Sequence, residues 1–277
     1  MAVHPNKLLA QLSGRDQRLM LAAGETVRVA SGEILCEPGE AIGSVYFPTS
    51  GTVSLLSLAA GRAGFGRGVV GREGMIGTPL VLRSATAMFR AVVQASATAL
   101  RIDAAKFSEA LLVSQTLQRS LLGYVGYVMD QVASSVVCAR FHDLESRLAG
   151  CLLVNRDRGE SCRFHVTHGI LAGMLGVRRS SISLAAYELQ RRGLIEYHRG
   201  EVSVIDAIGL EDAACQCYKA DRARMSAREN AAGGRHPGRH LSGIDKGDAC
   251  FSPDGSVRVV AQSQAPNPQP PLWSQRS

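Results

Sequence analysis

The side chains with the clearest chemical potential lie between residues 166 and 206 of this 277-residue sequence. Arg178 and Arg179 stand at the expected start of a helix, and Ser180 and Ser183 follow on its first two turns. An arginine guanidinium can donate two hydrogen bonds at once to guanine O6 and N7, whereas hydroxyl groups and helix N-termini suit phosphates. These residue types at this spacing indicate recognition of a nucleic acid rather than a chemical reaction.

The charge of the chain is compatible with an anionic partner. Its formal net charge is +7, and residues 163–200 contain six arginines against two glutamates. A basic surface attracts nucleic acid, but the same composition also fits a solvated helix face. Charge alone therefore leaves both interpretations open.

Motifs that would indicate an enzyme are weak or missing. Gly66, Gly68 and Gly71 match the G-x-G-x-x-G fingerprint of dinucleotide-binding proteins, but that fingerprint also requires a following helix and an acidic residue about 20 positions further on. Neither is present, so we interpret the pattern as the loop of a β-hairpin. The sequence contains neither H-E-x-x-H nor G-x-S-x-G, so we predict no catalytic residue and no enzymatic activity.

The seven cysteines are odd in number and irregularly spaced, which indicates reduced thiols. Cys215 and Cys217 alone are too few for a zinc site, which needs four ligands. Only Cys36 lies in the first 137 residues, so an N-terminal iron–sulfur cluster is not expected either. We therefore predict no metal and no cofactor.

The N-terminus lacks the long apolar core of a signal peptide. No apolar run approaches the roughly 18–20 residues of a membrane span. A cytoplasmic protein without a membrane partner is expected.

The elements that must position these residues begin with short strands between residues 25 and 103. Turn-forming sequences, including the glycine-rich run 61–74, separate them, and this spacing favours a small barrel or β-roll. The predicted strands are 26–29, 34–36, 45–47, 52–58, 69–70, 89–95 and 99–102.

A long helix is predicted from about residue 115 to residue 138, with apolar residues along one side. This stripe comprises Leu117, Leu121, Val125, Val128, Val132 and Val136. The helix could pack on its own domain, or it could pair with its copy in a homodimer, where Gly123 and Gly126 would permit close approach. Another amphipathic helix is predicted at residues 141–154.

A helix-turn-helix followed by a hairpin is predicted next. Thr167 can cap a helix over 168–175, Gly176 ends it, and a second helix covers 178–192. Small Ala172 and apolar Ile182 stand where two helices must cross and anchor. Residues 194–206 then read as strand, tight turn and strand, which is a wing.

Several segments resemble regulators of the Crp/Fnr family across roughly residues 6–224. The segments are Glu37-Pro-Gly-Glu40, Val45-Tyr-Phe-Pro48, Val70-Gly-Arg-Glu-Gly-Met-Ile-Gly77, Phe89-Arg-Ala-Val-Val-Gln94 and Leu171-Ala-Gly-Met-Leu-Gly-Val-Arg-Arg179. The resemblance implies a cyclic-nucleotide-binding-type β-roll, a dimerisation helix and a winged helix. Arg179, Ser180 and Leu184 match the base-reading positions of the family. Leu184 replaces the arginine of the cyclic-AMP-responsive members, so the operator sequence is not implied.

We therefore predict an α+β regulator in four parts: a sensor domain at 1–112, a dimerisation helix at 113–141, a winged helix-turn-helix at 142–212 and an extension at 213–277, largely disordered beyond about residue 225. It is expected to bind double-stranded DNA as a homodimer, and RNA polymerase if it activates transcription. The predicted DNA-binding residues are Thr167, Arg178, Arg179, Ser180, Ser183, Leu184 and Arg199. The alternative is a protein-binding sensor or scaffold without DNA contact.

A candidate effector pocket comprises Gly77, Thr78, Arg83 and Ser84. The family's ligand-binding members have a glutamate for the ribose hydroxyl where Thr78 stands, and an Arg-Ser pair for the phosphate. Counted back without gaps from residue 89, that pair falls on Ala87 and Met88. Cyclic AMP is therefore not expected as the effector, although a four-residue loop shift would bring Arg83 and Ser84 into place for an anion.

Overall fold

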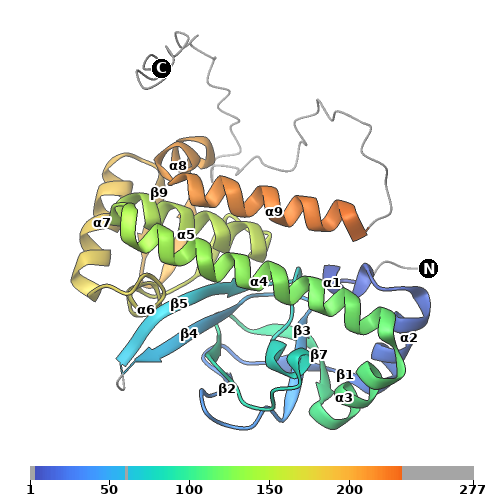
Figure 1. Cartoon of the computed structure of the whole chain (residues 1–277). Helices are drawn as coiled ribbons and strands as arrows, with labels where there is room; N and C mark the ends of the chain where they lie inside the picture. The colour runs from blue at the N-terminus through green and yellow to red at the C-terminus, as the bar shows by residue number, and fades with distance from the viewer. Residues whose placement is uncertain (1–3, 60–61, 233–277) are drawn as a thin grey trace, which may run out of the picture.

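Short β-prone segments in the N-terminal half form two antiparallel sheets, as the turn spacing predicts. The computed structural model describes residues 4–59 and 62–232, and Figure 1 shows this β-roll below a long helix. One sheet has the strand order β1-β7-β3 and the other β2-β6-β4-β5. The strands are β1 (Gly24–Val29), β2 (Ile34–Cys36), β3 (Ser44–Pro48), β4 (Val53–Ala59), β5 (Arg62–Val70), β6 (Arg90–Val93) and β7 (Ala97–Asp103).

Helices close the open side of the roll. They are α1 (Lys7–Ala10), α2 (Gly14–Ala23), the 3-10 turn η1 (Thr78–Leu82) and α3 (Ala104–Val113). Phe47 and Phe107 are fully buried in the resulting core, with ring centroids 6.4 Å apart. The side-chain amide of Asn6 donates to the carbonyl oxygens of Pro48 and Gly74, each at 2.9 Å, so the N-terminal segment is fixed on the roll.

The glycine-rich run 61–74 is more than the turn that its composition predicts. It contains β5, and Gly66 and Gly68 pair with Leu56 and Leu55 of β4. The G-x-G-x-x-G pattern therefore begins inside the second strand of a hairpin instead of forming its loop. Glycine has a low β propensity, but tertiary pairing overrides propensity when a complete apolar strand lies alongside.

The long helix α4 (Gln115–Phe141) belongs to the roll over its first half. Leu117 and Leu121 are fully buried in the core that contains Phe107, and Val125 is 6% exposed there. For these three side chains the structure favours the first of the two alternatives, packing on their own domain, and their burial leaves them no surface for a dimer contact. The apolar stripe therefore changes its surroundings along the helix. Its first half is buried in the roll, Val128 is partly buried, and Val132 and Val136 are exposed.

By length and composition α4 could also cross a membrane, since an 18-residue window has a mean hydropathy of 1.3. The expectation that no apolar segment is long enough for a membrane span is therefore wrong when helix length and mean hydropathy are the criteria. A single such helix is a weak indication, and it carries the exposed charged residues Arg119, Asp130 and Arg140.

The second domain begins with α5 (Leu144–Gly159) and is built around one apolar cluster that includes Leu148, Leu152, Ile182 and Leu189, all fully buried. A three-stranded sheet of order β8-β10-β9 covers it. The remaining elements are β8 (Arg163–His165), α6 (His168–Leu175), α7 (Arg179–Arg191), β9 (Ile195–His198), β10 (Glu201–Val204) and α8 (Ala207–Ala213). Strand β8 was not predicted.

A last helix, α9 (Gln216–Ala232), packs against α4 and α5 (Figure 1). The prediction of disorder beyond about residue 225 is wrong up to Ala232. Arg228 explains the difference, because its guanidinium lies over the rings of Tyr124 and Tyr127 and donates to the carbonyl of Glu73. The rest of the predicted tail, 233–277, lies outside the described residues.

A buried arginine joins the two domains. Arg158 of α5 has a side chain 6% exposed, with Nε 3.6 Å from Glu73 of the roll and a terminal nitrogen 3.2 Å from Asp221 of α9. It also donates to the hydroxyl of Tyr127 and to the carbonyl of Val69. One cation therefore satisfies groups from the roll, α4 and α9.

Candidate nucleic-acid interface

Helices α6 and α7 form the expected helix-turn-helix. The hydroxyl of Thr167 accepts from the backbone N–H of Ile170 and caps α6. Gly176 ends α6 at φ +65°, a left-handed conformation that glycine adopts without steric cost. On α7, Ile182 is fully buried against the domain core, which fixes the angle between the helices.

The wing is a hairpin with a two-residue turn. Arg199 and Gly200 have φ values of +48° and +87°, as a type I′ turn requires, and His198 pairs with Glu201. A Cβ on Gly200 would lie 2.6 Å from the His165 ring, so glycine is needed there for packing as well as for conformation. The turn presents Arg199 to solvent.

All the predicted DNA-binding residues are exposed. They are Thr167, Arg178, Arg179, Ser180, Ser183, Leu184 and Arg199. Leu184 is 73% exposed. Tyr187, 63% exposed, lies one turn beyond Ser183 on the same face, and the sequence reasoning missed it.

The arginines at the two ends of α7 differ in their partners. Arg191 forms an ion pair with Glu188, and Arg192 forms one with Glu145 at 2.5 Å. Within the described part of the chain, the guanidinium groups of Arg178 and Arg179 have no hydrogen-bonded or ionic partner. Positive charge is therefore uncompensated at the N-terminal end of α7, where a recognition helix enters the major groove.

A small polar cluster supports this end of the helix. The Ser183 hydroxyl lies 3.0 Å from His168 Nδ1, and the His168 ring lies against Tyr197 of the wing, with centroids 4.4 Å apart. Partial burial, with a contribution from the charge of Arg179, lowers the pKa of His168. The neutral imidazole therefore adds no positive charge of its own. Neither His168 nor Tyr197 was predicted.

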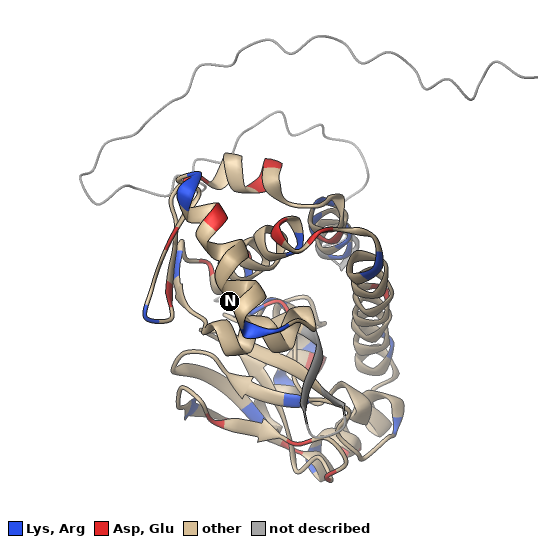
Figure 2. Cartoon of the chain, turned by 90° about the vertical axis from the view of Figure 1, so that its left-hand side faces the viewer, with Lys and Arg blue, Asp and Glu red and all other residues tan. Residues whose placement is uncertain are grey.

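Basic residues do not form a single patch. Figure 2 shows lysines and arginines distributed over both the roll and the helical domain. The unpaired arginines at the start of α7 therefore indicate the DNA-binding surface better than the net charge of +7 does.

The predicted effector residues do not lie together. Gly77 and Thr78 line a cavity of about 30 Å³ in the roll, whose other walls are mainly apolar. Arg83 and Ser84 are exposed and are not part of its lining. Arg83 also has φ +60° as the residue that ends η1.

The structure changes two expectations about cysteine. Cys162 is disulfide-bonded, so the expectation that all cysteines are reduced is wrong at this position. Cys138 and His142 lie beside Cys215 and Cys217. From the sequence, Cys215 and Cys217 alone are too few ligands for a metal site. The sequence reasoning missed this group because it considered only ligands close together in sequence.

Two family models match the chain. A cyclic nucleotide-binding domain matches residues 26–113, and a Crp-like helix-turn-helix domain matches residues 146–213. Together they cover more than half of the 277 residues. No curated protein matches the chain in sequence.

Solved structures share the fold. The c-di-GMP responsive global regulator CLP of Xanthomonas campestris is 17% identical, with a TM-score of 0.58 over 69% of this chain and 99% of that chain. Two CRP or CRP/FNR family transcriptional regulators from Thermus thermophilus are 20% and 17% identical, with TM-scores of 0.58 and 0.56. These cover 68% and 69% of this chain and 96% and 98% of their own.

Fold and site define a regulator that combines a cyclic-nucleotide-binding-type β-roll with a winged helix-turn-helix. The chain belongs to the Crp/Fnr family, and it is a transcription regulator with a helix-turn-helix DNA-binding domain.

Proposed function

We propose that the protein reads double-stranded DNA in a sequence-specific way with the exposed face of α7, acting as a homodimer in the cytoplasm and without enzymatic activity. The observation that carries this proposal is the pair of exposed, unpaired arginines Arg178 and Arg179 at the start of α7. The paired arginines at the other end of the helix are already satisfied.

The residues divide between base and phosphate contacts. Arg179, Ser180 and Leu184 project from the helix where base edges would lie, and an arginine there suits guanine. Arg178, Thr167, Ser183 and Arg199 are placed for phosphates, which fix the position of the protein without reading sequence.

The homodimer would form along the second half of α4. The exposed apolar side chains on this helix are Leu122, Met129, Val132, Val136, Val137 and Phe141. A Cβ on Gly123 or Gly126 would meet no atom within 4 Å in the single chain, so both glycines leave room for another helix. In such a dimer the two α7 helices would lie about 34–36 Å apart, one turn of DNA.

The roll would receive the signal, and Arg158 would link it to the DNA-binding domain. The Xanthomonas relative is named as responsive to c-di-GMP, but the small apolar cavity beside Thr78 supports no cyclic nucleotide here. If the protein activates transcription, RNA polymerase is the expected further partner.

The test is selection of bound sequences from random duplexes, followed by affinity measurements across a salt titration. Arg179→Ala should weaken binding to the selected site by about 1–3 kcal/mol and relax base preference. Arg178→Ala should weaken binding more evenly across sequences and reduce the salt dependence by about one counterion.

Arg191→Ala is the matched control, because it removes an arginine from the same helix whose charge is paired with Glu188. It should bind nearly as well as the unmodified protein. If Arg178→Ala and Arg179→Ala keep full affinity and selectivity, α7 is not the recognition helix. If no duplex is selected at all, the alternative of a protein-binding scaffold replaces this proposal.

A further inference from the structure

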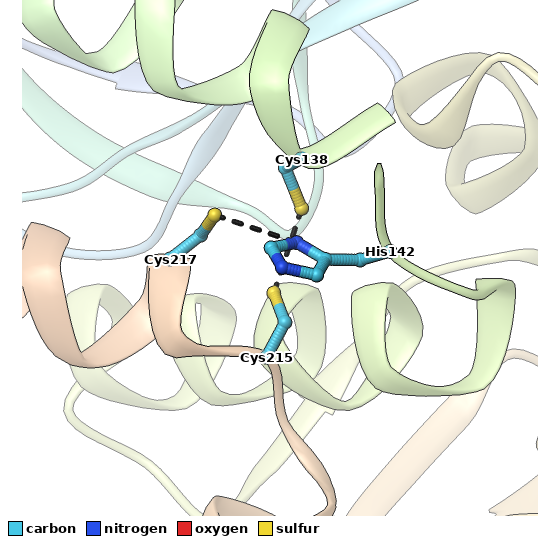
Figure 3. Close-up of side chains that lie close together, drawn as sticks. All are labelled: Cys138, His142, Cys215 and Cys217. Atoms are coloured by element: carbon cyan, nitrogen blue, oxygen red, sulfur yellow. Dashed lines mark hydrogen bonds between the residues drawn. The ribbon is translucent and has the colours of Figure 1, made fainter. Parts of the chain in front are cut away.

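Four side chains with metal-binding atoms come together where the two domains meet. Cys138 lies on the last turn of α4, His142 follows that helix, and Cys215 and Cys217 lie at the start of α9 (Figure 3). One ligand atom from each residue lies within 4.8 Å of the others. The four come from positions up to 79 residues apart in the chain, so tertiary folding alone creates the group.

Two of the distances between ligand atoms match the edges of a tetrahedral site around one ion. The sulfurs of Cys138 and Cys215 are 3.5 Å apart, and the sulfur of Cys217 is 3.6 Å from His142 Nδ1. A tetrahedron with bonds of about 2.0–2.3 Å has edges of about 3.5–3.8 Å. A cluster of several irons occupies the space between its ligands and would hold them further apart. A disulfide would need the two sulfurs at about 2.05 Å.

The backbone holds the ligands in this arrangement. The N–H of His142 donates to the carbonyl of Cys138 at 3.1 Å, which closes the last turn of α4. The N–H of Cys215 donates to the carbonyl of Ser146 at 3.3 Å, which ties the start of α9 to α5. The C-x-x-x-H and C-x-C spacings thus become two arms that face one another.

Positive charge lies beside the group. Three thiolates with a divalent ion carry a net charge of −1, and Arg147 and Arg224 line the same cavity. That cavity has a volume of about 150 Å³ and is also lined by all three cysteines, so an ion can reach them.

We propose that Cys138, His142, Cys215 and Cys217 bind one zinc ion. Three sulfurs and one imidazole nitrogen form a closed tetrahedral set of the kind found in structural zinc sites, with no position left for a substrate. The ion would join the end of α4, the segment that leads into the DNA-binding domain and the first turn of α9. The site does not depend on DNA binding, and its test is independent of that activity.

The experiment is metal analysis of the full-length protein, purified under reducing conditions from zinc-supplied cells and without a metal-binding tag. About one zinc per chain is expected, and Cys217→Ser should reduce this to about one-tenth or less because a Cys₃His site loses a ligand. Cys36→Ser is the matched control. Its sulfur hydrogen-bonds the Phe89 carbonyl at 3.4 Å, a contact that serine can keep, and it lies outside the group.

Cobalt(II) substitution provides a second readout that does not require every variant to be stable. The unmodified protein should show the intense visible absorption of tetrahedral cobalt bound to thiolates. His142→Cys should retain the ion and shift that spectrum, since a fourth sulfur replaces nitrogen.

Four results would overturn the proposal. They are reduced protein that holds no zinc and gives no cobalt spectrum, equal metal loss in Cys36→Ser and Cys217→Ser, recovery of iron with inorganic sulfide, and a Cys138–Cys215 disulfide in place of the metal.

Discussion

The DNA-binding domain and the β-roll differ in how their candidate sites are assembled. In the DNA-binding domain, every residue predicted to contact DNA lies exposed on α6, α7, their flanks or the wing turn. In the roll, of the four predicted effector residues only Gly77 and Thr78 line the cavity, while Arg83 and Ser84 lie outside it. A site carried on one helix follows from the helical repeat, whereas a site between loops depends on where each loop ends.

The two regions are nevertheless joined by buried contacts. Arg158 of the DNA-binding domain is surrounded by Glu73 of the roll and Asp221 of α9, with side chains 5% and 18% exposed. The main-chain oxygen of Arg158 also lies where a Cβ on Gly71 would be, so the contact leaves no room for a larger residue. Variants at this contact test whether the two regions unfold together.

The largest effect is expected from Arg158→Ala. Removing one partner of a buried ion pair leaves its carboxylates without compensation, which costs about 3–5 kcal/mol. We expect a loss of this size in the free energy of unfolding, measured by urea titration of the full chain. A loss of this size would show that the roll and the DNA-binding domain stabilise each other through Arg158.

Arg192→Ala is the control for the Arg158 variant. Arg192 pairs with Glu145 across a surface where both side chains are at least 30% exposed, so its loss should cost less than about 1 kcal/mol. Equal losses in the two variants would show that the buried network contributes no special stability.

The sequence predicted what depends on neighbours along the chain and missed what depends on the fold. Thr167, Gly176 and Ile182 specify the helix-turn-helix because each acts within one or two helical turns. The strands of the roll were found in the same way. Of strand β5 only residues 69–70 were predicted, because its glycines are strand residues only beside β4.

Long-range contacts explain the remaining errors. The stripe on α4 has one periodicity, and the sequence could not show that Leu117 and Leu121 face the roll while Val136 faces solvent. Helix α9 was missed because its ordering depends on aromatic rings about 100 residues earlier in the chain. The cysteine group has the same origin, since Cys138 and Cys215 are separated by 77 positions.

A smaller effect is expected at the exposed half of α4, the element that both regions share. Met129 is 65% exposed in the single chain. If it lies in a symmetric interface, Met129→Lys places two charges in that apolar contact and weakens dimerisation. We expect the dimer dissociation constant to rise about tenfold to a hundredfold, or about 1.4–2.8 kcal/mol, in sedimentation equilibrium.

The control for this variant is Leu112→Lys, since Leu112 is 69% exposed but belongs to α3 and not to α4. It should leave the dissociation constant unchanged. An unmodified chain that sediments as a monomer at all concentrations would refute the homodimer.

The smallest effect is expected in the roll, where cyclic AMP should not bind. A cavity of about 30 Å³ has room for about two water molecules, and Thr78 offers no carboxylate for a ribose hydroxyl. Arg83 is exposed outside that cavity, so it cannot donate to a phosphate held within it. Calorimetry with the full chain should therefore give no binding heat at micromolar nucleotide, and Arg83→Ala should titrate like the unmodified protein. Arg101→Ala controls for a change of surface charge, because Arg101 is an exposed arginine paired with Glu25. Micromolar binding that Arg83→Ala abolishes and Arg101→Ala preserves would show that the loop moves by several residues to form the phosphate site. The effector site of the roll would then form only when its ligand binds, whereas the DNA-binding face of α7 is already formed in the free protein.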